Sequence, residues 1–247
     1  MLVLTPTRRF SVFSVGSAAP PARAPPPPAP AAATRARVLL IHGYTSDGAA
    51  FRARCAGLAK KALKGLDLVA PDAPRAVCAA HALPGAARAA QRAWFHPADA
   101  DADARVRPAT SVRWDGWREA LAALVALVDA PGAPWAGAVA FSQGAPMAAL
   151  LCAARPGLFR FVVSAGGFAP RDPDAAAALA RAAPLGVASL HCAGANDPLV
   201  PRERTGELAA LFAGGALLDH DGAHQLPPNS LHAAIRDFVA AALAAPA

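Results

Sequence analysis

A serine flanked by small residues is the first feature of the chain that could perform covalent chemistry. It is Ser142, in the stretch Ala140-Phe141-Ser142-Gln143-Gly144. Small residues two positions before and after a serine permit a tight turn that projects the hydroxyl, as a nucleophile requires. Where such a turn joins a strand to a helix, the next backbone N–H, here that of Gln143, can stabilise an oxyanion. The motif alone is weak, because the chain is rich in alanine and glycine.

Two later loops contain polar side chains that could activate this serine. Asp197 follows an apolar stretch that ends near residue 193, and His224 follows the last apolar stretch, which ends at His220. A histidine can take the proton of a serine hydroxyl while a carboxylate orients the imidazole. We therefore predict a catalytic triad of Ser142 as nucleophile, Asp197 as acid and His224 as general base. This chain order is the one found in α/β-hydrolases, and it differs from that of other serine-hydrolase folds.

Each of these residues also has a simpler interpretation. Asp197 precedes a proline and could be only a turn residue, because aspartate side chains commonly bond to nearby backbone. His220 and His224 have a spacing that could place two metal ligands on one helix face. Gly222 between them predicts a turn instead, so we expect His220 to close a strand and predict no metal site. Ser142 could merely cap a helix.

The loop after the first predicted strand supplies a second candidate oxyanion donor. His42-Gly43-Tyr44 directly follows an apolar run, and α/β-hydrolases take their second oxyanion N–H from this loop. We assign the donor to the backbone of Tyr44 and expect His42 to be a structural residue at the strand end. This chemistry requires no cofactor, and we predict none.

From residue 37 onward, apolar strand-like runs alternate with stretches of helical spacing. The predicted strands span residues 38–41, 66–70, 137–141, 159–164, 187–193 and 216–220. The predicted helices span residues 49–63, 117–128, 145–154, 175–182, 202–212 and 230–243. This alternation predicts an α/β fold with a doubly wound, mostly parallel sheet and helices on both faces. In such a sheet ligands bind beyond the carboxyl ends of the strands, which is where the polar loops lie.

The segment 74–113 interrupts this alternation. It is long and irregular, and such segments in compact domains are usually functional lids or disordered insertions. We predict a lid-like insertion that covers the substrate. Trp94 and Phe95 within it, and Trp114 just after it, are candidates for an apolar substrate pocket. The same three aromatic side chains could instead pack the insertion against the core, and the sequence does not separate these alternatives.

The first 36 residues differ in composition from the rest of the chain. They are rich in Ser, Thr, Ala and Pro and contain no acidic residue, the first being Asp47. We predict a disordered tail over residues 1–36 and one catalytic domain over residues 37–247. An acid-free tail with arginines is typical of a transit peptide, which predicts a chloroplast or mitochondrial location. If the tail is only a Pro/Ala-rich linker, the predicted location is the cytoplasm.

Charge and cysteine content argue against several other classes. The net charge is +7, but five of the 24 basic residues lie in the first 37 positions, and the remainder is nearly balanced. That remainder has no basic stripe with interleaved aromatics, so we predict no nucleic-acid partner. No apolar stretch is long enough for a membrane span. The four cysteines lie far apart, which predicts buried free thiols instead of a disulfide framework or zinc site.

Four stretches together resemble the FSH-type serine hydrolases. They are VLLIHGYTSDGAAF (38–51), GAVAFSQGA (137–145), LHCAGANDPLVPRERTGELAALF (190–212) and HDGAHQLP (220–227). The resemblance covers residues 37–240 and implies an α/β-hydrolase fold and an esterase or thioesterase acting on small-molecule acyl substrates. Ser142, Asp197 and His224 match the family's triad one by one. Ala140 departs from the family, which usually has glycine there, and we expect tolerated strain.

Two other functions remain open on the sequence. Acyl-protein thioesterases and small carboxylesterases share the Phe-Ser-Gln-Gly elbow, although the Arg202-Glu203-Arg204 stretch favours the FSH type. A catalytically idle α/β-hydrolase fold that binds a ligand would be a different class. The complete set of triad residues argues against it.

Overall fold

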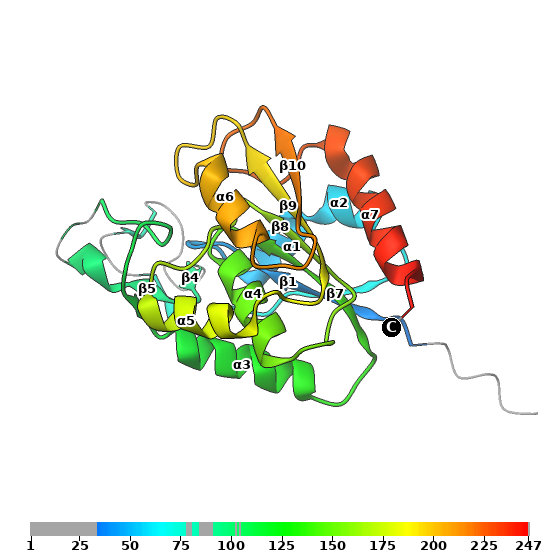
Figure 1. Ribbon diagram of the computed structural model, residues 1–247, viewed down its shortest axis with the longest axis horizontal. Helices are drawn as coiled ribbons and strands as arrows, with labels where there is room; N and C mark the ends of the chain where they lie inside the picture. Colours follow the sequence, from blue (N-terminus) through cyan, green and yellow to red (C-terminus); the bar gives the residue numbers. More distant parts are fainter. Residues whose placement is uncertain (1–33, 78–80, 84–90, 102, 104, 247) are drawn as a thin grey trace, which may run out of the picture. The chain divides into compact units, whose positions relative to one another are not determined.

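A sheet of six parallel strands forms the centre of the computed structural model (Figure 1). Its strand order is β10-β9-β8-β7-β1-β2, and every neighbouring pair runs parallel. The strands are β1 (Arg37–Ile41), β2 (Asp67–Val69), β7 (Trp135–Phe141), β8 (Phe161–Ala165), β9 (Ala188–Gly194) and β10 (Ala216–His220). The predicted mostly parallel sheet is confirmed, with each strand close to its expected position.

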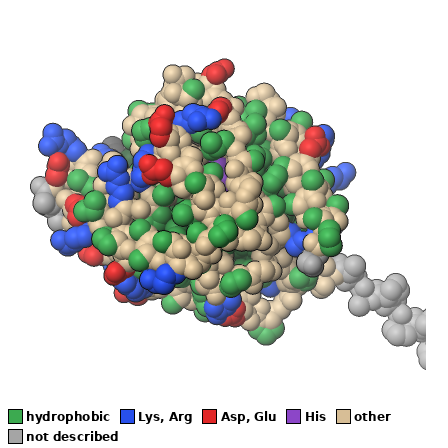
Figure 2. Space-filling model, in the orientation of Figure 1, with side chains coloured by type: hydrophobic (Ala, Val, Ile, Leu, Met, Phe, Trp, Pro, Cys, Tyr) green, Lys and Arg blue, Asp and Glu red, His purple; other side chains and the backbone are tan. Residues whose placement is uncertain are grey.

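The structure describes residues 34–77, 81–83, 91–101, 103 and 105–246. Residues 1–33, which make up nearly all of the predicted tail, lie outside the described residues, and so does Cys78. The disordered tail and the organellar location therefore stay predictions. No helix among the described residues is long and apolar enough to cross a membrane. On the face shown in Figure 2, basic and acidic side chains lie interspersed.

Helices cover both faces of the sheet (Figure 1). One face carries α1 (Gly48–Arg54), α2 (Ala56–Ala62) and α7 (His232–Ala244). The other carries α3 (Trp117–Asp129), α4 (Gly144–Ala154), α5 (Pro173–Ala182) and α6 (Arg202–Ala209). The core therefore consists of two apolar layers, one on each side of the strands, as the doubly wound α/β fold requires.

Strand β1 shows how the sequence produces these two layers. Val38 and Leu40 pack in the layer under α1, α2 and α7, whereas Leu39 and Ile41 pack in the layer under α3 to α6. Successive side chains of a strand point to opposite faces. A strand covered on both sides is therefore apolar at every position, and this explains the continuous apolar run.

The direction of winding changes between β1 and β7. Strand β2 lies on one side of β1, and β7, the next strand of the sheet along the chain, lies on the other. The loops that leave the carboxyl ends of β1 and β7 therefore diverge, which creates the crevice where α/β sheets bind ligands. Residues 42–47 and the elbow around Ser142 form these two loops.

Three predicted helices differ in detail from the observed ones. The predicted helix 49–63 is divided at the buried Cys55 into α1 and α2. The predicted helix 202–212 ends at Ala209, and the predicted helix 230–243 begins with the 3-10 turn η4 (Asn229–Leu231) before α7. All three differences concern turns at helix ends, where hydrogen bonding is shared between 3-10 and α geometry.

The described residues of segment 74–113 form short irregular elements. Strand β3 (Arg75–Ala76) pairs antiparallel with β4 (Arg92–Ala93), and β5 (His96–Pro97) pairs with β6 (Trp114–Asp115). A 3-10 turn, η3 (Ala98–Asp101), follows β5. These strands lie outside the six-stranded sheet. The predicted irregular insertion is therefore present, while its role as a cover for substrate stays a prediction.

Candidate active site

Ser142 lies in the sharp turn between β7 and α4. Its φ is 51°, in the left-handed region that residues other than glycine rarely adopt. The Ser142 N–H donates a hydrogen bond of 2.9 Å to the Ala165 carbonyl at the end of β8. At Gly144, a Cβ atom would lie 2.2 Å from the Ile41 carbonyl oxygen, so glycine is needed for α4 to begin this close to β1. The turn has the geometry of a nucleophile elbow.

The structure brings Ser142, His224 and Asp197 together at the carboxyl edge of the sheet. His224 Nε2 lies 2.9 Å from Ser142 Oγ, and His224 Nδ1 lies 2.7 Å from Asp197 Oδ2. An ionised carboxylate can only accept hydrogen bonds, so Nδ1 carries the proton and Nε2 directs its lone pair at the serine hydroxyl. In this tautomer His224 is ready to accept the proton of Ser142.

Asp197 combines the two roles that the sequence left open. Its side chain is 1% exposed, and Oδ2 bonds to the imidazole of His224. The other oxygen, Oδ1, accepts hydrogen bonds of 2.9 Å from the N–H groups of Leu199 and Val200. The aspartate is thus a turn residue through one oxygen and the histidine's partner through the other. The turn thus fixes the orientation of the carboxylate that bonds to His224.

Gly166 leaves the space that the His224 ring occupies. Gly166, after β8, has a φ of 54°, and a Cβ atom there would lie 2.8 Å from His224 Cε1. Sequence reasoning gave Gly166 no role, because nothing in the pattern shows that an imidazole packs against it. His220 ends β10, and its Nδ1 accepts a hydrogen bond of 3.0 Å from the Gly222 N–H. The expectation that His220 closes the strand is confirmed.

His42 is structural, as expected. Its Nδ1 donates to the Gly43 carbonyl at 2.8 Å, and its Nε2 accepts from the Ala73 N–H at 3.0 Å. Both ring nitrogens are therefore used by backbone groups, and burial lowers the pKa of His42. The neutral ring holds the loop after β1 against the chain after β2.

The two predicted oxyanion donors lie on the loops that flank the switch point. Tyr44 lines the same cavity as Ser142. Gln143 occupies the N-cap position of α4, where backbone N–H groups and the helix dipole favour negative charge. The assignment of the Tyr44 and Gln143 amides as oxyanion donors stays a prediction.

The side chain of Gln143 has a second task that sequence reasoning missed. Its Oε1 accepts a hydrogen bond of 2.8 Å from the Trp94 N–H, and its Nε2 donates one of 2.7 Å to the Phe95 carbonyl. The residue after Ser142 thus ties segment 74–113 to the elbow. The glutamine directly after Ser142 was the one signal that the sequence offered.

The predicted substrate-pocket role of Trp94, Phe95 and Trp114 is wrong. All three lie in the hydrophobic core, and none lines the cavity beside Ser142. Phe95 and Trp114 stack with their ring centroids 3.8 Å apart, and Trp94 Nε1 donates to the His42 carbonyl at 2.8 Å. Burying these large rings anchors the insertion, so the packing alternative is the one that the structure shows.

The cavity beside Ser142 and His224 has a volume of about 340 Å³. Part of its wall is apolar and includes Phe141, Phe168 and Val200, with the exposed side chains of Leu83 and Leu199. Another part is polar and cationic, formed by Tyr44, Thr45, Arg54, His81 and Arg107. Sequence reasoning missed the two arginines and His81, because they lie outside the motifs and converge only in three dimensions.

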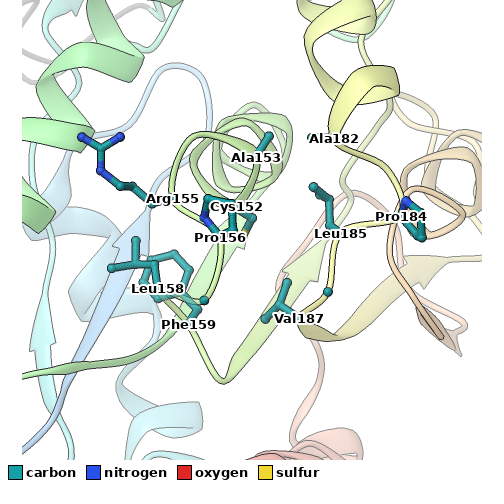
Figure 3. A pocket seen from close by; sticks show the side chains of 12 residues that line it. Cys152, Ala153, Arg155, Pro156, Leu158, Phe159, Ala182, Pro184, Leu185 and Val187 are labelled. Atoms are coloured by element: carbon teal, nitrogen blue, oxygen red, sulfur yellow. The ribbon is translucent and has the colours of Figure 1, made fainter. Parts of the chain in front are cut away.

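A second cavity, of about 280 Å³, lies at the opposite edge of the sheet, where β8 and β9 begin (Figure 3). Cys152, Pro156, Phe159, Leu185 and Val187 are among the residues that line it. Burial raises the pKa of the Cys152 thiol to about 12, so this sulfur is a poor nucleophile. This cavity is remote from the triad.

Comparisons with known proteins show which family the chain resembles over most of its length. A profile of the family described as serine hydrolase (FSH1) matches residues 32–234. Esterase OVCA2 of Bos taurus is 32% identical over 207 residues, which cover 77% of this chain and 89% of the relative. Human esterase OVCA2 is 30% identical over the same shares of the two chains.

Solved structures support the fold. Acyl-protein thioesterase 2 of Zea mays has a TM-score of 0.59 at 18% identity, covering 87% of this chain and 96% of that one. An identity this low supports the α/β-hydrolase fold and nothing finer. The match of the family profile to most of the chain decides the assignment. The chain belongs to the serine hydrolase (FSH1) family and is a hydrolase of the esterase type.

Proposed function

We propose that this protein hydrolyses carboxylic esters or thioesters of small acyl substrates through an acyl-enzyme formed on Ser142. The observation that carries the proposal is the continuous hydrogen-bonded chain from Ser142 Oγ through His224 to Asp197. A serine hydroxyl is a weak nucleophile at neutral pH, and a base at 2.9 Å from its oxygen supplies the missing activation.

In the first half of the reaction, Ser142 Oγ attacks the carbonyl carbon while His224 Nε2 takes the hydroxyl proton. The carbonyl π electrons move to oxygen, giving a tetrahedral intermediate beside an imidazolium ion. Asp197 stabilises that imidazolium and keeps its tautomer and orientation. When the intermediate collapses, the bond to the alcohol or thiol breaks, and the leaving group takes the proton from His224.

In the second half, water replaces the serine as nucleophile. His224 removes a proton from water as it attacks the acyl-enzyme, and returns the proton to Ser142 Oγ when the acid leaves. In both halves the negative oxygen is stabilised by the Gln143 and Tyr44 amides. Each such donor contributes about 3–4 kcal/mol to lowering the barrier in comparable enzymes.

The cavity limits the size of the group that is bound near the serine. Its volume of about 340 Å³ lies at the small end of the range for ligand sites. The apolar side chains of Phe141, Phe168 and Val200 provide contacts for a short hydrocarbon chain. We therefore propose short- to medium-chain acyl groups as the first substrates to test.

The test is hydrolysis of p-nitrophenyl butyrate and of the thioester butyryl-N-acetylcysteamine. Wild type is expected to hydrolyse at least one of them, and Ser142→Ala is expected to lower kcat/KM by a factor on the order of 10⁴ to 10⁶. Ser230→Ala is the matched control, because Ser230 is exposed and far along the chain from the elbow. Equal activity of Ser142→Ala and wild type would refute the proposed nucleophile. A folded wild type that is inactive on every ester tested would favour a ligand-binding protein.

A further inference from the structure

The cavity beside Ser142 contains two arginines, Arg54 at the end of α1 and Arg107 in segment 74–113. Its described lining residues include no aspartate or glutamate. The described wall therefore carries a net positive charge. A cavity whose charge is of one sign concentrates ligands of the opposite sign, because its low-dielectric walls focus the field.

Arg54 is held beside the triad by aromatic packing. Its guanidinium carbon lies 5.0 Å from the centre of the Phe141 ring, and that ring lies 4.9 Å from the His224 ring. One aromatic side chain thus separates the guanidinium from the catalytic imidazole. The Arg54 side chain is exposed, and it forms no ion pair with a carboxylate among the described residues. Its N–H donors can reach a ligand.

Arg107 is positioned by a buried histidine. Its Nη1 donates to His81 Nε2 at 3.1 Å, and His81 Nδ1 lies 3.0 Å from the Tyr44 hydroxyl. Because arginine can only donate, His81 Nε2 has a lone pair, and the proton of the neutral ring lies on Nδ1. His81 therefore donates to Tyr44. Arg107 is linked in this way to the loop that supplies a proposed oxyanion donor.

We propose that this cavity selects esters or thioesters that carry an anionic group, a carboxylate or a phosphate, bound by Arg54 and Arg107. The inference rests on the proposed function and specifies its substrate class. A guanidinium presents N–H groups that match carboxylate and phosphate oxygens, and such charge-assisted hydrogen bonds are stronger than neutral ones. Methylene groups between the anion and the reacting carbonyl contact Phe141, Phe168 and Val200.

Two chemical sources of the anion fit the same arginines. In one, the acyl chain ends in a carboxylate, as in a half-ester of a dicarboxylic acid. In the other, the leaving group carries phosphate, as in a coenzyme A thioester. Monoethyl glutarate with its neutral counterpart ethyl pentanoate tests the first source. Pentanoyl-coenzyme A with pentanoyl-N-acetylcysteamine, which lacks phosphate, tests the second.

The primary experiment measures binding instead of turnover, so it does not depend on catalysis. Ser142→Ala protein is titrated with monoethyl glutarate, ethyl pentanoate and the two thioesters in a calorimeter. The anionic member of at least one pair is expected to bind about tenfold more tightly than the neutral member, with the difference shrinking at high salt. Adding Arg54→Gln is expected to remove most of that difference.

Arg181→Gln is the matched control, because it removes the same charge from an exposed position on α5 outside this cavity. It is expected to leave the preference unchanged. Equal binding of charged and neutral members in both pairs would overturn the inference, as would a preference that survives in both Arg54→Gln and Arg107→Gln. An equal loss in Arg181→Gln would also overturn it, because the effect would then reflect overall charge.

Turnover by wild type separates failure of this inference from failure of the proposed function. If the neutral compounds are hydrolysed and neither anion is preferred, the inference is wrong and the hydrolase proposal stands. If the anions bind through Arg54 but no ester is hydrolysed, the proposed function is wrong and the anion site stands.

Discussion

Two regions meet at Ser142, and they are built by different means. The carboxyl edge of the sheet places Ser142, Asp197 and His224 through backbone pairing, because β7, β9 and β10 belong to one continuous parallel sheet. Segment 74–113, where it is described, is held mainly by buried rings and by side chains that bond to backbone. The positions of these three side chains therefore follow from the topology of the sheet, whereas the position of segment 74–113 depends on individual side-chain contacts.

The contacts that hold segment 74–113 in place join it to residues elsewhere in the chain. Gln143 bonds to the backbone of Trp94 and Phe95. Arg92 Nε donates to the Ala73 carbonyl at 2.8 Å, and Asp172 Oδ2 accepts from the Trp114 N–H at 2.9 Å. Substitutions at the sheet edge should therefore mainly reduce turnover, and substitutions in segment 74–113 should mainly reduce stability.

The largest effect is expected for Asp197→Asn, at the sheet edge. An amide at this position no longer enforces the tautomer with the proton on His224 Nδ1, so kcat should fall by a factor on the order of 10³ to 10⁴. Steady-state kinetics with p-nitrophenyl butyrate measure the loss. Asp221→Asn, in the exposed loop before His224, is the control and should stay within about twofold of wild type. Near-normal turnover of Asp197→Asn would show that this carboxylate is not the orienting acid.

In segment 74–113, Phe95→Ala should reduce stability instead of selectivity. The fully buried ring stacks on Trp114, and its removal should cost about 3–5 kcal/mol of unfolding free energy in urea. Leu199→Ala is the matched change on the cavity surface, where the side chain is 47% exposed. It should alter stability by less than about 1 kcal/mol and change KM for longer acyl chains. The reverse pattern would return Phe95 to the substrate pocket.

The link between the two regions is tested by Gln143→Ala. This change leaves the buried Trp94 N–H and Phe95 carbonyl without their partner, so the unfolding free energy should fall by about 2–4 kcal/mol. The backbone N–H proposed for the oxyanion is retained. The exposed Gln225→Ala serves as control. Unchanged stability of Gln143→Ala would mean that this side chain does not hold segment 74–113 against the elbow.

The smallest expected effect concerns the sheet interior. Burial lowers the pKa of His191 to about 4, and its ring nitrogens bond to Ser164 and Ser189. Between that value and the unfolded pKa near 6.5, the unfolded chain binds more protons, so stability falls as the pH decreases. From pH 7.5 to pH 5 the unfolding free energy should drop by about 2 kcal/mol through this residue.

Urea unfolding at both pH values measures this drop. His191→Gln keeps a polar side chain without a titrating group, and it should lose less stability than wild type over the same interval. The pKa of His42 is also lowered by burial and adds to the dependence in both proteins. An identical pH dependence of wild type and His191→Gln would show that His191 titrates normally.

The sequence was sufficient to predict which loops meet at the carboxyl edge of the sheet. It was not sufficient to predict the side-chain contacts of segment 74–113 and of the cavity lining, for a physical reason. The loops that carry Ser142, Asp197 and His224 follow strands with unmistakable apolar runs, so their common edge could be inferred from order alone. The stacking of Phe95 on Trp114 and the approach of Arg54 to Phe141 depend on side-chain directions in three dimensions. Hydrophobic periodicity contains no information about such pairs. For the same reason, the sequence could not show that Trp94, Phe95 and Trp114 pack in the core instead of lining the substrate pocket.

The proposed function depends on the activation of Ser142 by His224 for covalent chemistry. It is tested most directly by labelling purified protein with a fluorophosphonate probe and locating the modified residue by peptide mass spectrometry. We expect labelling at Ser142 in wild type and in Ser230→Ala, no labelling of Ser142→Ala, and far slower labelling of His224→Ala. Absence of labelling in folded wild type, or labelling at a different serine, would contradict it.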